Sequence, residues 1–169
     1  MAQHNVQTPG AQCALPKQYT FRTLTDINTI LSELEQKLGL GDVLILGIKE
    51  LMVNAVEHGN LGIGYSCKTR LLEQGIWLEE VNRRLALKKN RHKTAALEID
   101  RQDGFMKITI TDAGPGFDPR PFVAAENGSG TAPNGRGLAL IRDAVFETLK
   151  FTERGRKVVA WAALQEKGF

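Results

Sequence analysis

The sequence contains no long hydrophobic run and very few cysteines. No apolar stretch approaches the roughly 18 residues that a membrane-spanning helix needs, and the N-terminus lacks the basic start and apolar core of a secretory signal. The two cysteines, Cys13 and Cys67, lie far apart, which predicts reduced thiols rather than disulfides or a metal site. A net charge of +3 is too small to indicate nucleic-acid binding by itself. We therefore expect a cytoplasmic protein.

The composition that remains is that of one globular domain. The 169 residues are 42% hydrophobic and 24% charged, enough for a single core. Residues 1–17 are polar and hold two prolines, so we expect a flexible leader, followed by a domain over 18–169. Residues 66–93 hold eight basic and three acidic side chains, a net +5 that exceeds the charge of the whole chain. This basic segment is interpreted as a solvated helix face, with an elaboration for a partner as the alternative.

The first half of the chain predicts a strand and three helices. Alternation predicts a strand over 18–23, and helical spacing predicts a helix that Thr25 or Asp26 caps and Gly39 ends. Asp42 can cap a second helix, which Gly59 stops. A third helix is predicted over 67–87, with a heptad repeat of Leu71, Leu78 and Leu85 and a weak point at Gly75.

The second half predicts strands around one helix. The expected elements are strands over 95–100 and 106–111, a loop over 112–134, a helix over 137–146, and strands over 147–153 and 157–164. A loop of this length in a compact domain is usually functional or mobile. The order of elements predicts an α+β fold, a two-layer sandwich with a mixed, mostly antiparallel sheet and helices on one face.

One stripe of the second helix carries polar side chains. Glu50, Asn54 and His58 follow one another at intervals of four residues, and Glu57 lies nearby. Asparagine is a poor helix former and is rarely placed inside a helix without a role. A solvated polar face and a functional site both remain open on this spacing alone, and His58 can also be explained as a cation at the helix C-terminus.

Two glycine-rich motifs follow later in the chain. D-A-G-P-G-F at 112–117 comes directly after a predicted strand, where a carboxylate could accept a hydrogen bond from an exocyclic amine such as that of adenine. N-G-R-G-L at 134–138 opens a predicted helix, whose free N–H groups favour phosphate. Taken singly, the first motif also suits a simple turn and the second a simple helix entry.

Together and in this order, the three motifs resemble the N-box, G1 box and G2 box of the GHKL (Bergerat) ATP-binding fold. The matching segments are E-x-x-x-N-A-x-x-H at 50–58, D-x-G-x-G-F at 112–117 and N-G-R-G-L at 134–138. With N-A-V-E-H-G-N-L-G, G-R-G-L-A-L-I-R-D-A-V-F-E and the single-domain length, the chain looks most like the anti-sigma-factor serine/threonine kinases, over roughly residues 19–164.

The resemblance implies a role for each matching residue. Asn54 would coordinate Mg²⁺ on the ATP phosphates, and Glu50 would be the general base on an acceptor serine. Asp112 would bind the adenine amine, Gly114 and Gly116 would line the adenine pocket, and residues 113–134 would form a lid. The G2 box would bind phosphate through Gly135, Arg136, Gly137 and Leu138. The chain departs from the family at one point. Members often have a threonine near the start of the last strand that touches the adenine, whereas this region here consists of Gly155, Arg156, Lys157 and Val158.

The implied function is a Mg²⁺-ATP-dependent serine kinase. Its substrate would be an anti-sigma-factor antagonist of STAS type, with a sigma factor as a further partner, and the chain would form a homodimer without contacting a membrane or nucleic acid. An ATP-binding regulatory module without phosphotransfer is the main alternative. Less favoured are a general ATPase and a nucleic-acid binder that uses the basic segment, with salt-dependent affinity. Trp77 and Trp161 are expected to serve in packing.

Overall fold

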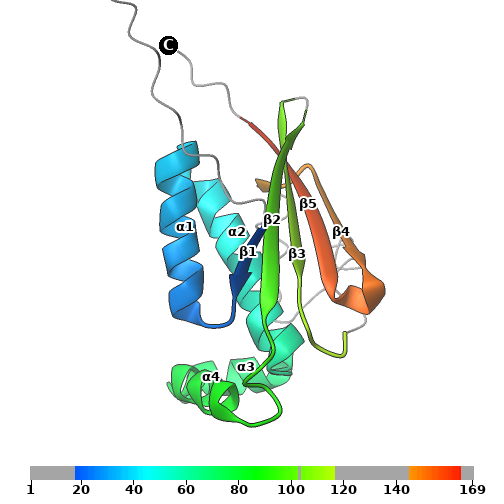
Figure 1. Ribbon diagram of the computed structural model, residues 1–169. Coiled ribbons are helices and arrows are strands. Elements are labelled where there is room, and N and C mark those ends of the chain that lie inside the picture. Colours follow the sequence, from blue (N-terminus) through cyan, green and yellow to red (C-terminus); the bar gives the residue numbers. More distant parts are fainter. Residues whose placement is uncertain (1–17, 103, 117–144, 165–169) are drawn as a thin grey trace, which may run out of the picture.

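The computed structural model describes residues 18–102, 104–116 and 145–164, and these form one sheet covered by helices on one face (Figure 1). In chain order the elements are β1 (Gln18–Phe21), α1 (Leu24–Leu38), α2 (Asp42–Asn54), the π-helical segment η1 (Ala55–Asn60), α3 (Tyr65–Glu73), α4 (Trp77–Ala86), β2 (Ala95–Gln102), β3 (Phe105–Thr111), β4 (Thr148–Thr152), the short 3-10 turn η3 (Glu153–Gly155) and β5 (Lys157–Ala163). The predicted leader, most of the loop over 112–134 and nearly all of the helix over 137–146 lie outside the described residues.

The sheet has the order β1-β2-β3-β5-β4, and every pairing among the described strands is antiparallel. The predicted α+β sandwich is confirmed, although these pairings contain no parallel component of the expected mixed sheet. Alternation along β3 sends Met106, Ile108 and Ile110 to the helical side, where all three are fully buried. The β2–β3 hairpin turns where it was predicted, with Gly104 at a positive φ of 80°.

Helix α1 begins two or three residues earlier than the sequence indicated. The N-cap is Thr23, not Thr25 or Asp26, because Thr23 keeps extended backbone angles and forms a capping box with Asp26. The Thr23 hydroxyl accepts the Asp26 N–H at 3.1 Å, and the Asp26 carboxylate accepts the Thr23 N–H at 2.9 Å. Gly39 ends the helix in the left-handed conformation, as predicted.

Helix α2 differs from prediction at both ends. Gly41 is its N-cap and makes no side-chain hydrogen bond. Asp42 is therefore not the cap but the first helical residue, where the helix dipole stabilises its carboxylate. At the other end the helix passes into the wider turns of η1, so Gly59 lies inside η1 and does not stop the chain there. The second half of the N-box therefore lies in π-helical turns, which occur frequently at functional sites.

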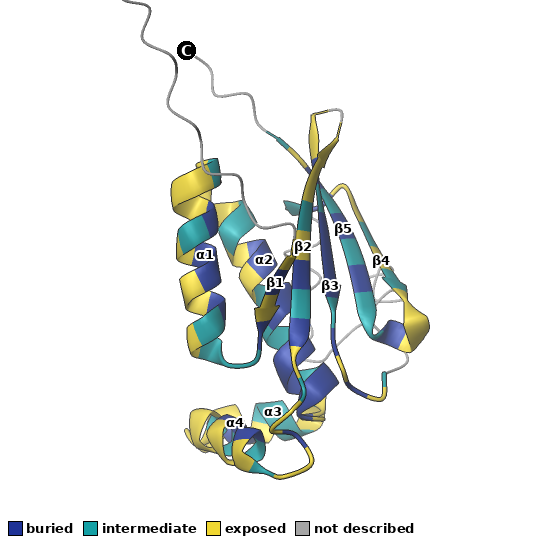
Figure 2. Cartoon of the chain, in the orientation of Figure 1, coloured by how far each residue is buried: buried dark blue, intermediate teal, exposed yellow. Residues whose placement is uncertain are grey.

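The predicted third helix is a hairpin of two short helices, α3 and α4. The chain turns at Gly75, whose φ of 70° lies in the left-handed region, which glycine adopts readily but which a right-handed helix does not contain. Because the direction changes there, the heptad repeat does not form one stripe: Leu71 and Leu85 are 8% exposed, but Leu78 is 52% exposed. Figure 2 shows this hairpin as mostly exposed, at one end of the buried core.

Candidate functional site

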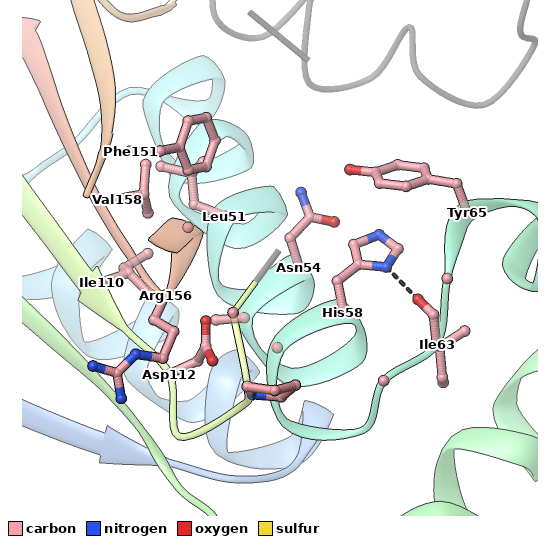
Figure 3. Close-up of a pocket in the computed structure, with 17 residues that line it drawn as sticks. Leu51, Asn54, His58, Ile63, Tyr65, Ile110, Asp112, Phe151, Arg156 and Val158 are labelled. Atoms are coloured by element: carbon pink, nitrogen blue, oxygen red, sulfur yellow. Dashed lines mark hydrogen bonds between the residues drawn. The ribbon is translucent and has the colours of Figure 1, made fainter. Parts of the chain in front are cut away.

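A cavity of about 440 Å³ opens between the N-box helix and the end of the sheet. Its apolar wall comes from α2 and the ends of β3, β4 and β5 (Leu51, Ile110, Phe151 and Val158), and its polar groups are Asn54, His58, Asp112 and Arg156 (Figure 3). The volume falls within the range of small-molecule sites, and an apolar wall with a few fixed polar groups is their usual lining. We therefore take this cavity as the candidate site.

Asp112 lies at the end of the cavity next to the sheet. Its carboxylate is held in place, since Oδ1 accepts the Gly114 N–H at 2.7 Å and the Asp112 N–H is bonded to the Arg156 carbonyl at 3.0 Å. The residue is only 8% exposed. Burial raises the pKa of Asp112, while the Gly114 N–H and the charges of Arg156 and Lys93 act in the opposite direction. The cavity is thus lined by a buried carboxylate that can accept a hydrogen bond from an amine.

Glycines allow the backbone segments around Asp112 to approach one another. A Cβ atom on Gly59 would lie 2.3 Å from the Asp112 carboxyl carbon, and one on Gly114 would lie 2.0 Å from the Gly59 carbonyl oxygen. Gly116 has a φ of 85° and packs against the Arg154 carbonyl. The G1 motif is therefore fitted tightly against η1 and the turn before β5, and no side chain larger than hydrogen fits at these points.

Asn54 and Glu50 lie one helical turn apart at the side of the cavity. The Asn54 Nδ2 group donates to Glu50 Oε1 at 3.5 Å, and Asn54 lines the cavity whereas Glu50 stands beside it. Because the amide directs its N–H toward Glu50, its oxygen is the atom left for a cation. The described residues contain no group of three or more His, Cys, Asp or Glu side chains that could hold a metal, so a metal here would rely on Asn54 and on a phosphate ligand, as Mg²⁺ commonly does.

Glu57 does not belong to the polar stripe that the sequence suggested. It is fully buried, accepts the Trp77 Nε1–H at 2.5 Å, and pairs with Lys68 Nζ at 2.6 Å. The wide turns of η1 direct this carboxylate to the α3–α4 hairpin instead of the cavity. Trp77 is thereby a packing residue, as expected, and links α4 to the N-box helix.

Other basic residues fasten the hairpin, and the segment that follows α4, to η1 and the residues after it. Arg84 Nη1 donates to the carbonyls of Leu61 at 3.0 Å and Gly62 at 2.8 Å, and Lys93 Nζ donates to the Asn60 carbonyl at 2.8 Å. Three of the eight basic residues in the charged segment, namely Lys68, Arg84 and Lys93, are therefore structural. This finding limits the interpretation of that segment as a purely solvated face.

The burial of His58 disfavours the cation that the sequence allowed at this helix end. Burial lowers the pKa of His58, and its Nδ1–H donates to the Ile63 carbonyl. The ring stacks on Tyr65, with centroids 4.2 Å apart and planes at 24°. Figure 3 shows the side chains of Asn54, His58 and Tyr65 following one another along one side of the cavity.

The structure brings together the two predicted boxes that it describes. Asn54, Asp112 and Gly116 line the cavity, Gly114 packs behind Asp112, and Glu50 lies beside Asn54. Gly135, Arg136, Gly137 and Leu138 lie outside the described residues, so their phosphate role stays a prediction. Sequence reasoning missed Gly59, whose small size admits the Asp112 carboxylate, although the N-A-V-E-H-G string contained it.

The fold and this site are those of an ATP-binding domain of the GHKL class, with a buried carboxylate, Asp112, directly after the central strand β3. A family model described as "Histidine kinase-like ATPase domain" matches residues 20–161, and the chain belongs to that family. Comparison with curated proteins and with solved structures gave no match. Among the described residues, no helix is both long and apolar enough to cross a membrane.

Proposed function

We propose that the protein is a Mg²⁺-ATP-dependent serine/threonine kinase of the anti-sigma-factor type. The observation that supports this most is the pairing of Glu50 with Asn54 beside the cavity, with Oε1 and Nδ2 3.5 Å apart. A plain nucleotide-binding pocket has no need of a carboxylate next to its metal ligand, whereas a kinase needs a base near the transferred phosphoryl group.

The chain's own residues divide the work as follows. Asp112 accepts the adenine amine, and the apolar wall around Ile110 holds the base. Asn54 holds Mg²⁺, which when bound neutralises charge on the phosphates. Gly135, Arg136, Gly137 and Leu138 bind phosphate through backbone N–H groups and one guanidinium.

The reaction itself needs one proton acceptor. Glu50 takes the proton of the acceptor serine hydroxyl, the serine oxygen forms a bond to the γ-phosphorus, and the bond from that phosphorus to the β,γ-bridging oxygen breaks to release ADP. The phosphoryl group moves from one oxygen to another without any redox change.

The proposed substrate is a serine of an anti-sigma-factor antagonist of STAS type. We further propose that the protein sequesters a sigma factor and works as a homodimer. These partners rest on the resemblance of the N-box and G2-box strings to the anti-sigma-factor kinases.

An ATP-binding regulatory module without phosphotransfer is the second candidate. It is supported by the length of the Asn54–Glu50 contact, which at 3.5 Å is too long for a strong hydrogen bond. The two candidates differ in the fate of the γ-phosphate, and only the kinase depends on Glu50.

The first experiment is calorimetric titration with ATP, with and without Mg²⁺, on the natural protein and on Asn54→Ala. Binding that requires Mg²⁺ and that Asn54→Ala loses supports the nucleotide site. Incubation with candidate STAS-type proteins and labelled ATP then tests transfer, with Glu50→Gln as the control that binds ATP but transfers nothing. Absence of ATP binding under both conditions refutes the proposal, and binding with equal transfer by Glu50→Gln refutes the role of Glu50.

A further inference from the structure

His58 presents an unsatisfied hydrogen-bond acceptor at the cavity. Its Nε2 atom has essentially no solvent access and no hydrogen-bond partner among the described residues, although the residue lines the cavity. A buried polar atom without a partner is unfavourable and calls for an explanation. In a binding site the usual explanation is a group that the ligand supplies.

The tautomer of His58 is fixed by its surroundings. A carbonyl oxygen can only accept, so the contact with Ile63 requires the hydrogen on Nδ1. In the neutral ring, which burial favours, Nε2 then carries a lone pair. Stacking on Tyr65 at 4.2 Å holds the plane of the ring. Burial and the charge of Lys68 lower the pKa of His58, whereas the Ile63 contact and Glu50 act in the opposite direction. Nε2 is therefore an acceptor with a set direction.

The acceptor selects the chemistry of its partner. Phosphate oxygens carry no hydrogen at neutral pH and meet a lone pair unfavourably, whereas a hydroxyl or a water provides the hydrogen that Nε2 needs. His58 follows Asn54 by one helical turn and lies next to it in the cavity wall (Figure 3). The groups of a bound nucleotide that carry O–H near a metal ligand are the ribose hydroxyls and the water molecules on the metal.

We propose that His58 positions the bound nucleotide by accepting, at Nε2, a hydrogen bond from an O–H donor, either a ribose hydroxyl or a water on the metal. This inference rests on the proposed ATP binding and deepens it, because it assigns a contact to a residue that has no part in base recognition or proton abstraction. Tyr65 and the Ile63 carbonyl act behind it by orienting the ring.

The test uses three variants and calorimetric affinities for Mg²⁺-ATP. His58→Asn keeps a donor near Ile63 but loses the Nε2 acceptor, and His58→Gln can place an amide oxygen where Nε2 lies. We expect His58→Asn to bind about tenfold more weakly than the natural protein and His58→Gln to recover most of that loss. The matched control is His92→Asn, which changes an exposed histidine outside the cavity and should leave the affinity unchanged.

Analogues separate the two sources of the O–H group. If a ribose hydroxyl is the donor, the difference between the natural protein and His58→Asn disappears with 2′-deoxy-ATP or 3′-deoxy-ATP. If metal-bound water is the donor, the difference disappears with adenosine, which carries the ribose hydroxyls but no phosphate to hold a metal. A loss that persists in all of these conditions, or no loss at all, overturns the proposal. ATP binding by the natural protein in either case shows that the proposed nucleotide site stands independently of the role of His58.

A second measurement needs no variant and covers the case in which one fails to fold. Nitrogen-15 spectra of the natural protein report the protonation of each ring nitrogen of His58. We expect the Nδ1–H tautomer before and after Mg²⁺-ATP is added, with the Nε2 resonance moving as it accepts a hydrogen bond. Formation of an imidazolium on binding indicates a phosphate contact and overturns the proposal, as does an Nε2 resonance that does not move.

Discussion

Gly59→Ala provides the sharpest test of how the site is built. The new Cβ atom would lie 2.3 Å from the Asp112 carboxyl carbon and 2.6 Å from each carboxyl oxygen. Ordinary contacts begin at 3.4 Å, so the carboxyl carbon must withdraw by about 1.1 Å, the difference between 3.4 and 2.3. A shift of this size along the bond to the Gly114 N–H lengthens it from 2.7 Å to about 3.8 Å, beyond hydrogen-bond range.

Two opposing terms decide the stability of this variant. Loss of a hydrogen bond to a charged group costs about 1.5–3 kcal/mol, whereas alanine in place of glycine within a helix contributes about 0.8–1 kcal/mol. We expect a net loss of about 0.5–2 kcal/mol in the free energy of unfolding, measured by urea denaturation. The affinity for ATP should fall about 10- to 100-fold, because the adenine acceptor is displaced.

Gly41→Ala is the matched control for that experiment. A Cβ on Gly41 meets nothing within 4 Å, and the residue lies outside the cavity. Its ATP affinity should equal that of the natural protein. An affinity of Gly59→Ala within about twofold of the natural value would refute the assignment of Asp112 as the base acceptor in this geometry.

Three further predictions follow from the same contacts. Asp112→Asn should weaken ATP binding about tenfold or more in calorimetry, because one amide edge donates where the carboxylate accepts. Burial raises the pKa of Asp112, so its ionisation destabilises the fold above the folded pKa. The Asp112→Asn variant should therefore gain stability at pH 7 and lose that gain as the pH falls toward 3.8, the ordinary pKa. A gain that stays constant with pH would contradict the assignment. Trp77→Phe should cost about 1–3 kcal/mol in urea denaturation because Glu57 Oε1 loses its donor, and a cost near zero would show the bond to be unimportant. Leu85→Ala should cost about 2–5 kcal/mol but Leu78→Ala under about 0.5, because only Leu85 is buried; equal costs would contradict the break at Gly75.

The sheet and the first two helices were predictable because local signals agree with the fold. Alternation along β3, the helical spacing in α1 and the glycine at its end each identify one element without reference to the rest of the chain. The N-box and G1 motifs were predictable as parts of one site, since Asn54 and Asp112 line the same cavity.

The failures of prediction occur where distant contacts decide the structure. The heptad of leucines indicated one helix, but the buried bond from Trp77 to Glu57 and the turn at Gly75 favour a hairpin. Glu57 itself reads as a surface residue, because helical spacing cannot anticipate the wider turns of η1 that rotate it inward. No local pattern could show that Gly59 must be small to admit a carboxylate from a residue 53 positions later.

The α3–α4 hairpin contributes Tyr65 to the wall of the cavity and cannot be treated as a removable surface element. Its fastenings at Lys68, Trp77 and Arg84 all reach η1 or the residues just after it, and Tyr65 at its start supports the His58 ring. An engineered minimal domain that trims this hairpin would expose the Glu57 carboxylate and release one side of the pocket. The hairpin adds length and charge to the chain, and the pocket needs it to stay intact.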